Sequence, residues 1–125
     1  MILIFGGAYQ GKLDYVYENY GKNLSVFDCC EQNDSVDFSK DVINKFHLLV
    51  SAQVKSGADS LEYIDQNAEK LRGKIIICDD VSGGIVPLGA DVRLWRENVG
   101  RSMIRLTKHA DEVFRIFCGM GMRLK

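Results

Sequence analysis

The first thirteen residues carry the feature that most constrains how this chain folds. Met1–Phe5 is a continuous apolar run with β-branched residues, which is typical of a strand buried on both faces of a parallel sheet. Gly6–Lys12 reads Gly-Gly-Ala-Tyr-Gln-Gly-Lys, and apolar side chains then recur at helical spacing up to Gly21. We therefore expect a strand, a glycine-rich turn and a helix in direct succession.

The turn matches the pattern G-x-x-x-x-G-K in the strand-to-helix context that a phosphate-binding P-loop requires. Glycines let the backbone curl so that successive N–H groups face phosphate oxygens, and the helix dipole adds partial positive charge. Lys12 is expected to reach the terminal phosphates of GTP or ATP. The alternative is an ordinary glycine turn with an exposed lysine, which the register of strand, loop, lysine and helix disfavours. The predicted nucleotide-binding residues are Gly6, Gly7, Ala8, Tyr9, Gln10, Gly11, Lys12 and Leu13.

Leu13 departs from the P-loop pattern. The residue after the lysine is normally serine or threonine, whose hydroxyl ligates Mg²⁺, and leucine has no oxygen to offer. A cradle of backbone amides survives this change, whereas efficient phosphoryl transfer depends on the metal. We expect Mg²⁺ binding to be weakened or arranged through other residues.

The rest of the chain alternates apolar runs with segments of helical spacing. This order predicts a single α/β domain over residues 1–125, P-loop NTPase-like, with a mostly parallel, doubly wound sheet in three layers and ligands outside the carboxyl ends of its strands. Further strands are expected at 24–27, 75–78 and 112–118, helices at 41–55, 60–71 and 91–109, and loops at 28–41 and 81–90.

Composition agrees with one globular domain and excludes several classes of partner. The chain has 125 residues, of which 46% are hydrophobic and 26% charged. Its net charge of −1 gives no overall attraction to nucleic acid or to an anionic membrane, so a bound phosphate must be held by a local site. The four cysteines contain no C-x-x-C pair, which disfavours zinc. Without an export signal or a membrane span, we expect a cytoplasmic protein with reduced thiols.

Two adjacent acids follow the predicted strand at 75–78. P-loop proteins commonly carry here the acid that holds Mg²⁺ or its water. The side chains of Asp79 and Asp80 point to opposite sides of an extended segment, so we expect one of them to face the phosphates. We choose Asp80 as the metal ligand and catalytic residue; the alternative is that both acids form a turn or cap the next segment.

Three further side chains are candidates for binding phosphate or substrate. Arg96 and Arg101, on the predicted long helix, are suited to clamping a phosphate bidentately. Their spacing does not place them on one helical face, so a joint site needs a bend or break near Gly100. His47 is a candidate proton shuttle, with a satisfied core or edge histidine as the alternative.

Four segments together resemble the adenosylcobinamide kinase/adenosylcobinamide-phosphate guanylyltransferase family. They are Gly6–Lys12, Ile75–Pro87, Arg93–Arg101 and Ala110–Lys125, in the family's order and spacing. The resemblance covers the first strand, loop and helix, and nearly everything from Gly73 onward. The combination is far more specific than a P-loop alone.

The resemblance implies a cytoplasmic enzyme of cobalamin biosynthesis with a P-loop α/β fold. Such an enzyme phosphorylates the corrinoid adenosylcobinamide with GTP or ATP, then attaches GMP through a guanylylated histidine, and works as a homo-oligomer, a trimer. Asp80 would occupy the place of the family's acidic residue before Val-Gly, and Arg96, Gly100 and Arg101 would match its arginine-glycine-arginine helix. The segment that carries the histidine has no counterpart here, and His47 does not align with it, which argues against the guanylyltransferase step.

Two functions of different classes remain open at this stage. The first is a nucleotide-dependent kinase acting on a cobinamide-type corrinoid, with Lys12 stabilising the transferred phosphate. The second is a catalytically inactive module that holds GTP or a phosphate and regulates or scaffolds a partner. Leu13 favours the second function, whereas Lys12, Asp80 and the paired arginines favour the first.

Overall fold

The computed structural model describes residues 1–81 and 89–125. These residues form a six-stranded sheet in the order β2-β3-β4-β1-β5-β6, parallel throughout except for the antiparallel pair β5-β6. The strands are β1 (Ile2–Gly6), β2 (Val26–Asp28), β3 (Val42–Asn44), β4 (Ile75–Asp79), β5 (Glu112–Phe117) and β6 (Met120–Arg123). Most of the loop predicted at 81–90 lies outside the described residues.

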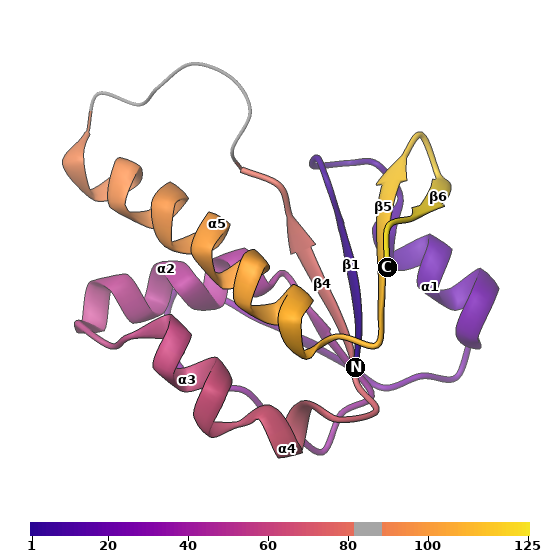
Figure 1. Ribbon diagram of the computed structural model, residues 1–125, viewed down its shortest axis with the longest axis horizontal. Helices are drawn as coiled ribbons and strands as arrows, with labels where there is room; N and C mark the ends of the chain where they lie inside the picture. Colours follow the sequence, from indigo (N-terminus) through magenta and orange to yellow (C-terminus); the bar gives the residue numbers. More distant parts are fainter. Residues whose placement is uncertain (82–88) are drawn as a thin grey trace.

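Helices cover both faces of this sheet. Figure 1 shows α1 on one side and α2, α3 and α5 on the other. The helices are α1 (Lys12–Tyr20), α2 (Phe46–Ser56), α3 (Ser60–Gln66), α4 (Ala68–Leu71) and α5 (Ala90–His109). The prediction of an α/β domain with a mostly parallel sheet between two helical layers is confirmed at this level.

The burial of the central strands explains why Ile2–Phe5 of β1 and Ile75–Cys78 of β4 are apolar at every position. Leu3 and Ile76 belong to the core cluster beneath α2, α3 and α5, whereas Ile4 and Ile77 belong to the cluster beneath α1. Because side chains alternate between faces, a strand covered on both sides needs apolar residues at odd and even positions alike. All four of these side chains are nearly inaccessible to solvent.

The helix predicted at 41–55 is wrong in its first turn. Val42–Asn44 forms strand β3, and α2 begins only at Phe46. Lys45 separates the two elements with a left-handed backbone, at φ 59°. A short apolar run fits a buried strand and a buried helix equally well, so spacing alone does not separate them. A positive φ at a lysine leaves no signal in the sequence.

Two further elements differ from the prediction. The helix expected at 60–71 is divided at Asn67 into α3 and α4. Strand β6 was not predicted; it pairs with β5 through a two-residue turn in which Cys118 and Gly119 have φ of 51° and 76°. Positive φ at both turn residues is the geometry that tight hairpins need, and it is usually signalled by Asn-Gly rather than by Cys-Gly.

Helix α5 runs unbroken through Gly100 for 20 residues. The bend or break that would bring Arg96 and Arg101 together is therefore absent from this helix. Among the described helices, none is both long enough and apolar enough to cross a lipid bilayer.

Candidate functional site

The candidate site lies where β1 and β4 end side by side. Gly6 is the register partner of Asp79, so the glycine loop, which we define as residues 6–13, starts directly opposite the end of β4. A side chain at Gly6 would overlap the carbonyl oxygen of Ile116 on β5. Gly11 has a φ of 85° just before α1, a conformation that glycine adopts without strain. The two glycines of the sequence pattern are thus required for different reasons.

The backbone of the glycine loop carries unused hydrogen-bond donors. Within the described residues, no protein oxygen accepts from the amide N–H groups of Ala8–Leu13. The first N–H groups of any helix lack partners within that helix, and α1 begins at Lys12. Such a row of free donors at the positive end of a helix dipole attracts an anion.

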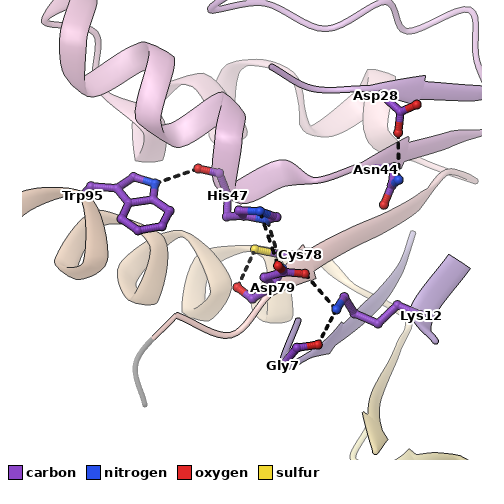
Figure 2. A network of polar contacts seen from close by, with 8 residues as sticks. All are labelled: Gly7, Lys12, Asp28, Asn44, His47, Cys78, Asp79 and Trp95. Carbon is purple, nitrogen blue, oxygen red and sulfur yellow. Dashed lines mark hydrogen bonds and ion pairs between the residues drawn. The ribbon is translucent and has the colours of Figure 1, made fainter. Parts of the chain in front are cut away.

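Lys12 is held inside the loop instead of projecting into solvent. Its ammonium group donates to the Gly7 carbonyl oxygen at 2.6 Å and lies 2.8 Å from Asp79 Oδ1. Only 8% of the residue is exposed. Figure 2 shows Lys12 between these two oxygens, one on the loop and one at the end of β4. The cation is thereby fixed at the base of the loop.

His47, at the start of α2, holds the other side of Asp79 (Figure 2). The Asp79 amide donates to Nδ1 of the ring at 3.2 Å, and Nε2 lies 3.5 Å from Asp79 Oδ2. The backbone of His47 is held in place as well, because the Trp95 indole N–H donates to the His47 carbonyl oxygen at 2.7 Å. Since Nδ1 accepts a hydrogen bond, a neutral ring must carry its proton on Nε2, facing the carboxylate.

The charge state of His47 follows from its surroundings. Burial lowers the pKa of His47 below its ordinary value of 6.5; the Asp79 carboxylate opposes this, while Lys12 and Lys45 lower the pKa further. The ring is therefore neutral near pH 7, with both nitrogens directed at Asp79. It is arranged to position that carboxylate, and neither nitrogen is free to attack a phosphorus atom.

An open cavity of about 410 Å³ joins these groups. Its volume is in the range of small-molecule sites. Lys12, His47 and Asp79 line it together with the loop and with residues from the carboxyl end of β3 and the start of α2. Its lining comprises Ala8, Tyr9, Gln10, Gly11, Lys12, Leu13, Asp14, Asn44, Lys45, His47, Leu48 and Asp79.

Asp80, which the sequence favoured over Asp79, lies elsewhere. Its backbone N–H donates to the Gly6 carbonyl oxygen at 2.8 Å, and the residue lines a second cavity beneath α5. The acid that contacts Lys12 is Asp79, whose side chain lies 2.8 Å from the ammonium group. A metal-binding role for Asp80 stays a prediction.

The two arginines do not meet at the glycine loop in this structure. Arg101 pairs with Glu97 at 2.6 Å on the exposed surface of α5, one turn away. Arg96 lies on the same unbroken helix and, like Arg101, is not among the described residues that line the glycine-loop cavity. Their assignment as phosphate ligands stays a prediction.

Residues with strained backbone conformations lie around the glycine-loop cavity. Three residues other than glycine have a positive φ in the described structure, namely Tyr9, Lys45 and Cys118. Tyr9 and Lys45 line the cavity, and the hairpin turn at Cys118 donates its N–H to Gln10 Oε1 at 2.7 Å. Strained residues of this kind concentrate at functional sites. Sequence reasoning named Asp79 only as the less favoured of two adjacent acids, and it missed Lys45, because neither residue carries a distinctive spacing.

The donors available to a cation are few. Among the described residues, no group of three or more histidine, cysteine, aspartate or glutamate side chains is arranged to hold a metal ion. Mg²⁺ commonly takes one or two carboxylates and completes its shell with water and substrate phosphates. Two described carboxylates, Asp14 and Asp79, line the glycine-loop cavity, and Asp79 is the one that contacts Lys12. Asp79 therefore fits that limited role, while the Leu13 side chain contributes no oxygen.

Comparison with known proteins adds no identification. No protein-family model matches this chain, and no curated protein gives a significant match.

Proposed function

We propose that this chain binds a nucleoside triphosphate through the glycine loop and transfers its terminal phosphoryl group to a cobinamide-type corrinoid. The binding part is carried by one observation: free amide donors and a buried ammonium group line the same open cavity. The corrinoid acceptor, the place in cobalamin biosynthesis and the trimeric state come from the family resemblance alone. A cytoplasmic location likewise stays a prediction.

The chemistry follows from the groups in the cavity. The loop amides and Lys12 would hold the phosphate oxygens and stabilise charge that develops on them during transfer. The acceptor hydroxyl oxygen would bond to the γ-phosphorus as the bond to the β–γ bridging oxygen breaks, and the hydroxyl proton would pass to Asp79 or to water. His47 would keep Asp79 in position. To engage phosphate, Lys12 must exchange at least part of its contact with Asp79 for the ligand.

A binding module without turnover is the second candidate. Leu13 favours it, because the residue lines the cavity where P-loop kinases present a metal-binding hydroxyl. A module of this kind would bind GTP, ATP or inorganic triphosphate with no need for Mg²⁺. The two candidates share the loop and differ only in metal dependence and turnover.

Calorimetric titration with GTP, ATP and inorganic triphosphate, each with and without Mg²⁺, tests the shared part. Lys12→Ala should weaken triphosphate binding by about tenfold to a hundredfold, since it removes a charge-assisted hydrogen bond. The matched control is Lys22→Ala, an exposed lysine beyond α1 that does not line the cavity. Absence of binding in the native chain, or equal affinity in both variants, would overturn the proposal.

Transfer of labelled γ-phosphate to adenosylcobinamide tests the catalytic part. Leu13→Ser should raise Mg²⁺-dependent turnover, because it restores the missing hydroxyl ligand. Asp79→Asn should abolish transfer, whereas Asp80→Asn should reduce it much less if Asp79 is the acting carboxylate. Tight, metal-independent binding with no transfer in any variant would identify the binding module instead.

A further inference from the structure

A second cavity of about 580 Å³ lies beneath α5, on the sheet face opposite α1. Phe5 and Val113 form its floor on β1 and β5, and Met103 and Ile104 form its wall on α5. Of the residues that the structure describes, none lines both this cavity and the glycine-loop cavity. The volume is typical of a small-molecule site, and the lining is mostly apolar.

A glycine in the middle of helix α5, Gly100, lines this cavity. Apart from its chain neighbours and the backbone of its own helix, a Cβ atom added at Gly100 would meet no atom of the described residues within 4 Å. Glycine is the poorest helix former apart from proline, and nothing in the described structure requires one in the middle of α5. Gly100 shares a helical face with Met103, Ile104, Thr107 and Lys108, all of which line the cavity. The missing side chain therefore leaves room on the wall of the cavity.

The ends of the cavity differ in charge. Lys108 lies near the end of α5 and, within residues 1–81 and 89–125, makes no hydrogen bond or ion pair. Lys125, beside it, donates to the Thr107 carbonyl oxygen at 2.9 Å. Asp80 lies at the other end, next to the glycine loop. An anion is therefore favoured at the lysine end of the cavity.

We propose that this cavity binds a small amphipathic anion. Its apolar body lies along α5 over Gly100, and its oxyanion, a carboxylate or a phosphate, pairs with Lys108. This assignment does not depend on the proposed nucleotide site, because the two cavities share none of their described lining residues. Among the described residues, Asp80 links the cavity to the loop, because its amide donates to the Gly6 carbonyl oxygen.

Calorimetric titration of the full chain, without nucleotide, tests the proposal. The probes are dodecanoate, dodecyl phosphate and dodecyltrimethylammonium, all below their micelle concentrations. Both anions should bind at least about tenfold more tightly than the cation, because a charge-assisted contact with Lys108 is gained only by an anion. The ratio of the two anion affinities then tells a carboxylate ligand from a phosphate ligand.

Three variants locate the binding. Gly100→Leu should abolish binding of both anions by filling the cavity wall. Lys108→Glu should lower anion affinity by about tenfold or more and favour the cation, whereas Lys22→Glu makes the same charge change away from the cavity and should alter little. Ile104→Glu places a carboxylate at an exposed position of the wall and should also remove anion binding, so the test holds even if Gly100→Leu does not fold.

Several results would overturn the proposal. One is equal affinity for all three amphiphiles; another is anion binding that survives in folded Gly100→Leu or in Ile104→Glu. Sedimentation velocity supplies a third. If the native chain self-associates and Ile104→Glu dissociates it, this face is an interface between copies of the chain and not a ligand site.

Discussion

His47 and Asp79 form the unit on which the glycine loop depends. Two contacts tie the ring to one residue, its Nδ1 to the Asp79 amide and its Nε2 toward the carboxylate. Asp79 in turn holds Lys12, which is almost fully buried. A change at His47 is therefore transmitted to the ammonium group through a single carboxylate.

The lowered pKa of His47 predicts how stability depends on pH. The unfolded chain takes up a proton near the ordinary value of 6.5, while the folded chain takes it up only at lower pH. Between these two values the unfolded state binds more protons, so the free energy of unfolding rises with pH there. The contribution of His47 to stability is therefore present above about pH 6.5 and is lost as pH falls below that value. Urea denaturation at a series of pH values between 5 and 8, in buffers of equal ionic strength, measures this.

His47→Asn is the matched variant for that measurement. It does not titrate, and its amide oxygen is able to accept from the Asp79 N–H. The variant should lose the pH dependence in this range while keeping most of its stability at pH 8. Carboxylates whose pKa is lowered by hydrogen bonds, such as Asp37 and Asp41, titrate at lower pH. They therefore do not contribute to the pH dependence of stability in this range. An unchanged pH profile in His47→Asn would contradict the role assigned to the ring.

At the scale of elements, the loop between β1 and α1 is shaped by its neighbours. On one side, the backbone of β5 passes so close to Gly6 that a side chain has no space. On the other, the hairpin turn donates the Gly119 N–H to the Gln10 carbonyl oxygen at 2.9 Å. The loop is thus braced by a strand and a turn that lie more than a hundred positions later in the chain.

Gly6 and Gly7 are adjacent but should respond differently to substitution. Gly6→Ala should destabilise the fold by about 1–3 kcal/mol, because its methyl group overlaps the Ile116 carbonyl and the backbone must shift. Gly7→Ala should have little effect on stability, since the nearest atom to the added carbon is Gln10 Cγ at 3.7 Å. Urea denaturation of the two variants measures the difference. Equal losses would mean that β5 does not constrain the loop in this way.

At the scale of the whole molecule, the sheet order places β1 at the centre. It pairs with β4 on one side and β5 on the other, whereas β2 and β6 lie at the edges. All four residues of β6 are exposed, and β2 is only three residues long. Backbone hydrogen bonds at the centre should therefore open only with the whole fold, and those at the edges more readily.

Hydrogen–deuterium exchange followed by mass spectrometry checks this order and the proposed function together. Amides of β1 and β4 should exchange most slowly, and those of β2 and β6 fastest. Addition of GTP should slow exchange at Ala8–Leu13, whose N–H groups have no acceptor within the described residues. If these loop amides exchange slowly before nucleotide is added and do not change afterwards, they are not free donors that bind an anion.

Local patterns were enough to predict much of this fold. The apolar strands β1, β4 and β5 and the helices α1 and α5 were each foreseen to within a few residues, because period and turn residues act over short distances. The loop pattern was located for the same reason, since its glycines and lysine are contiguous. Where short runs fit two structures, as at Val42–Asn44, local patterns were insufficient.

The remaining features depend on which distant segments meet. The sequence alone placed an acid at the end of β4 and a histidine at 47, but it did not reveal that Lys12 pairs with Asp79 or that both ring nitrogens are directed at that acid. The packing of the neighbouring strands and helices determines the direction of a side chain at the end of a strand. The physical reason is that hydrogen bonds and ion pairs between remote residues follow from sheet order and register, which no single stretch of sequence encodes.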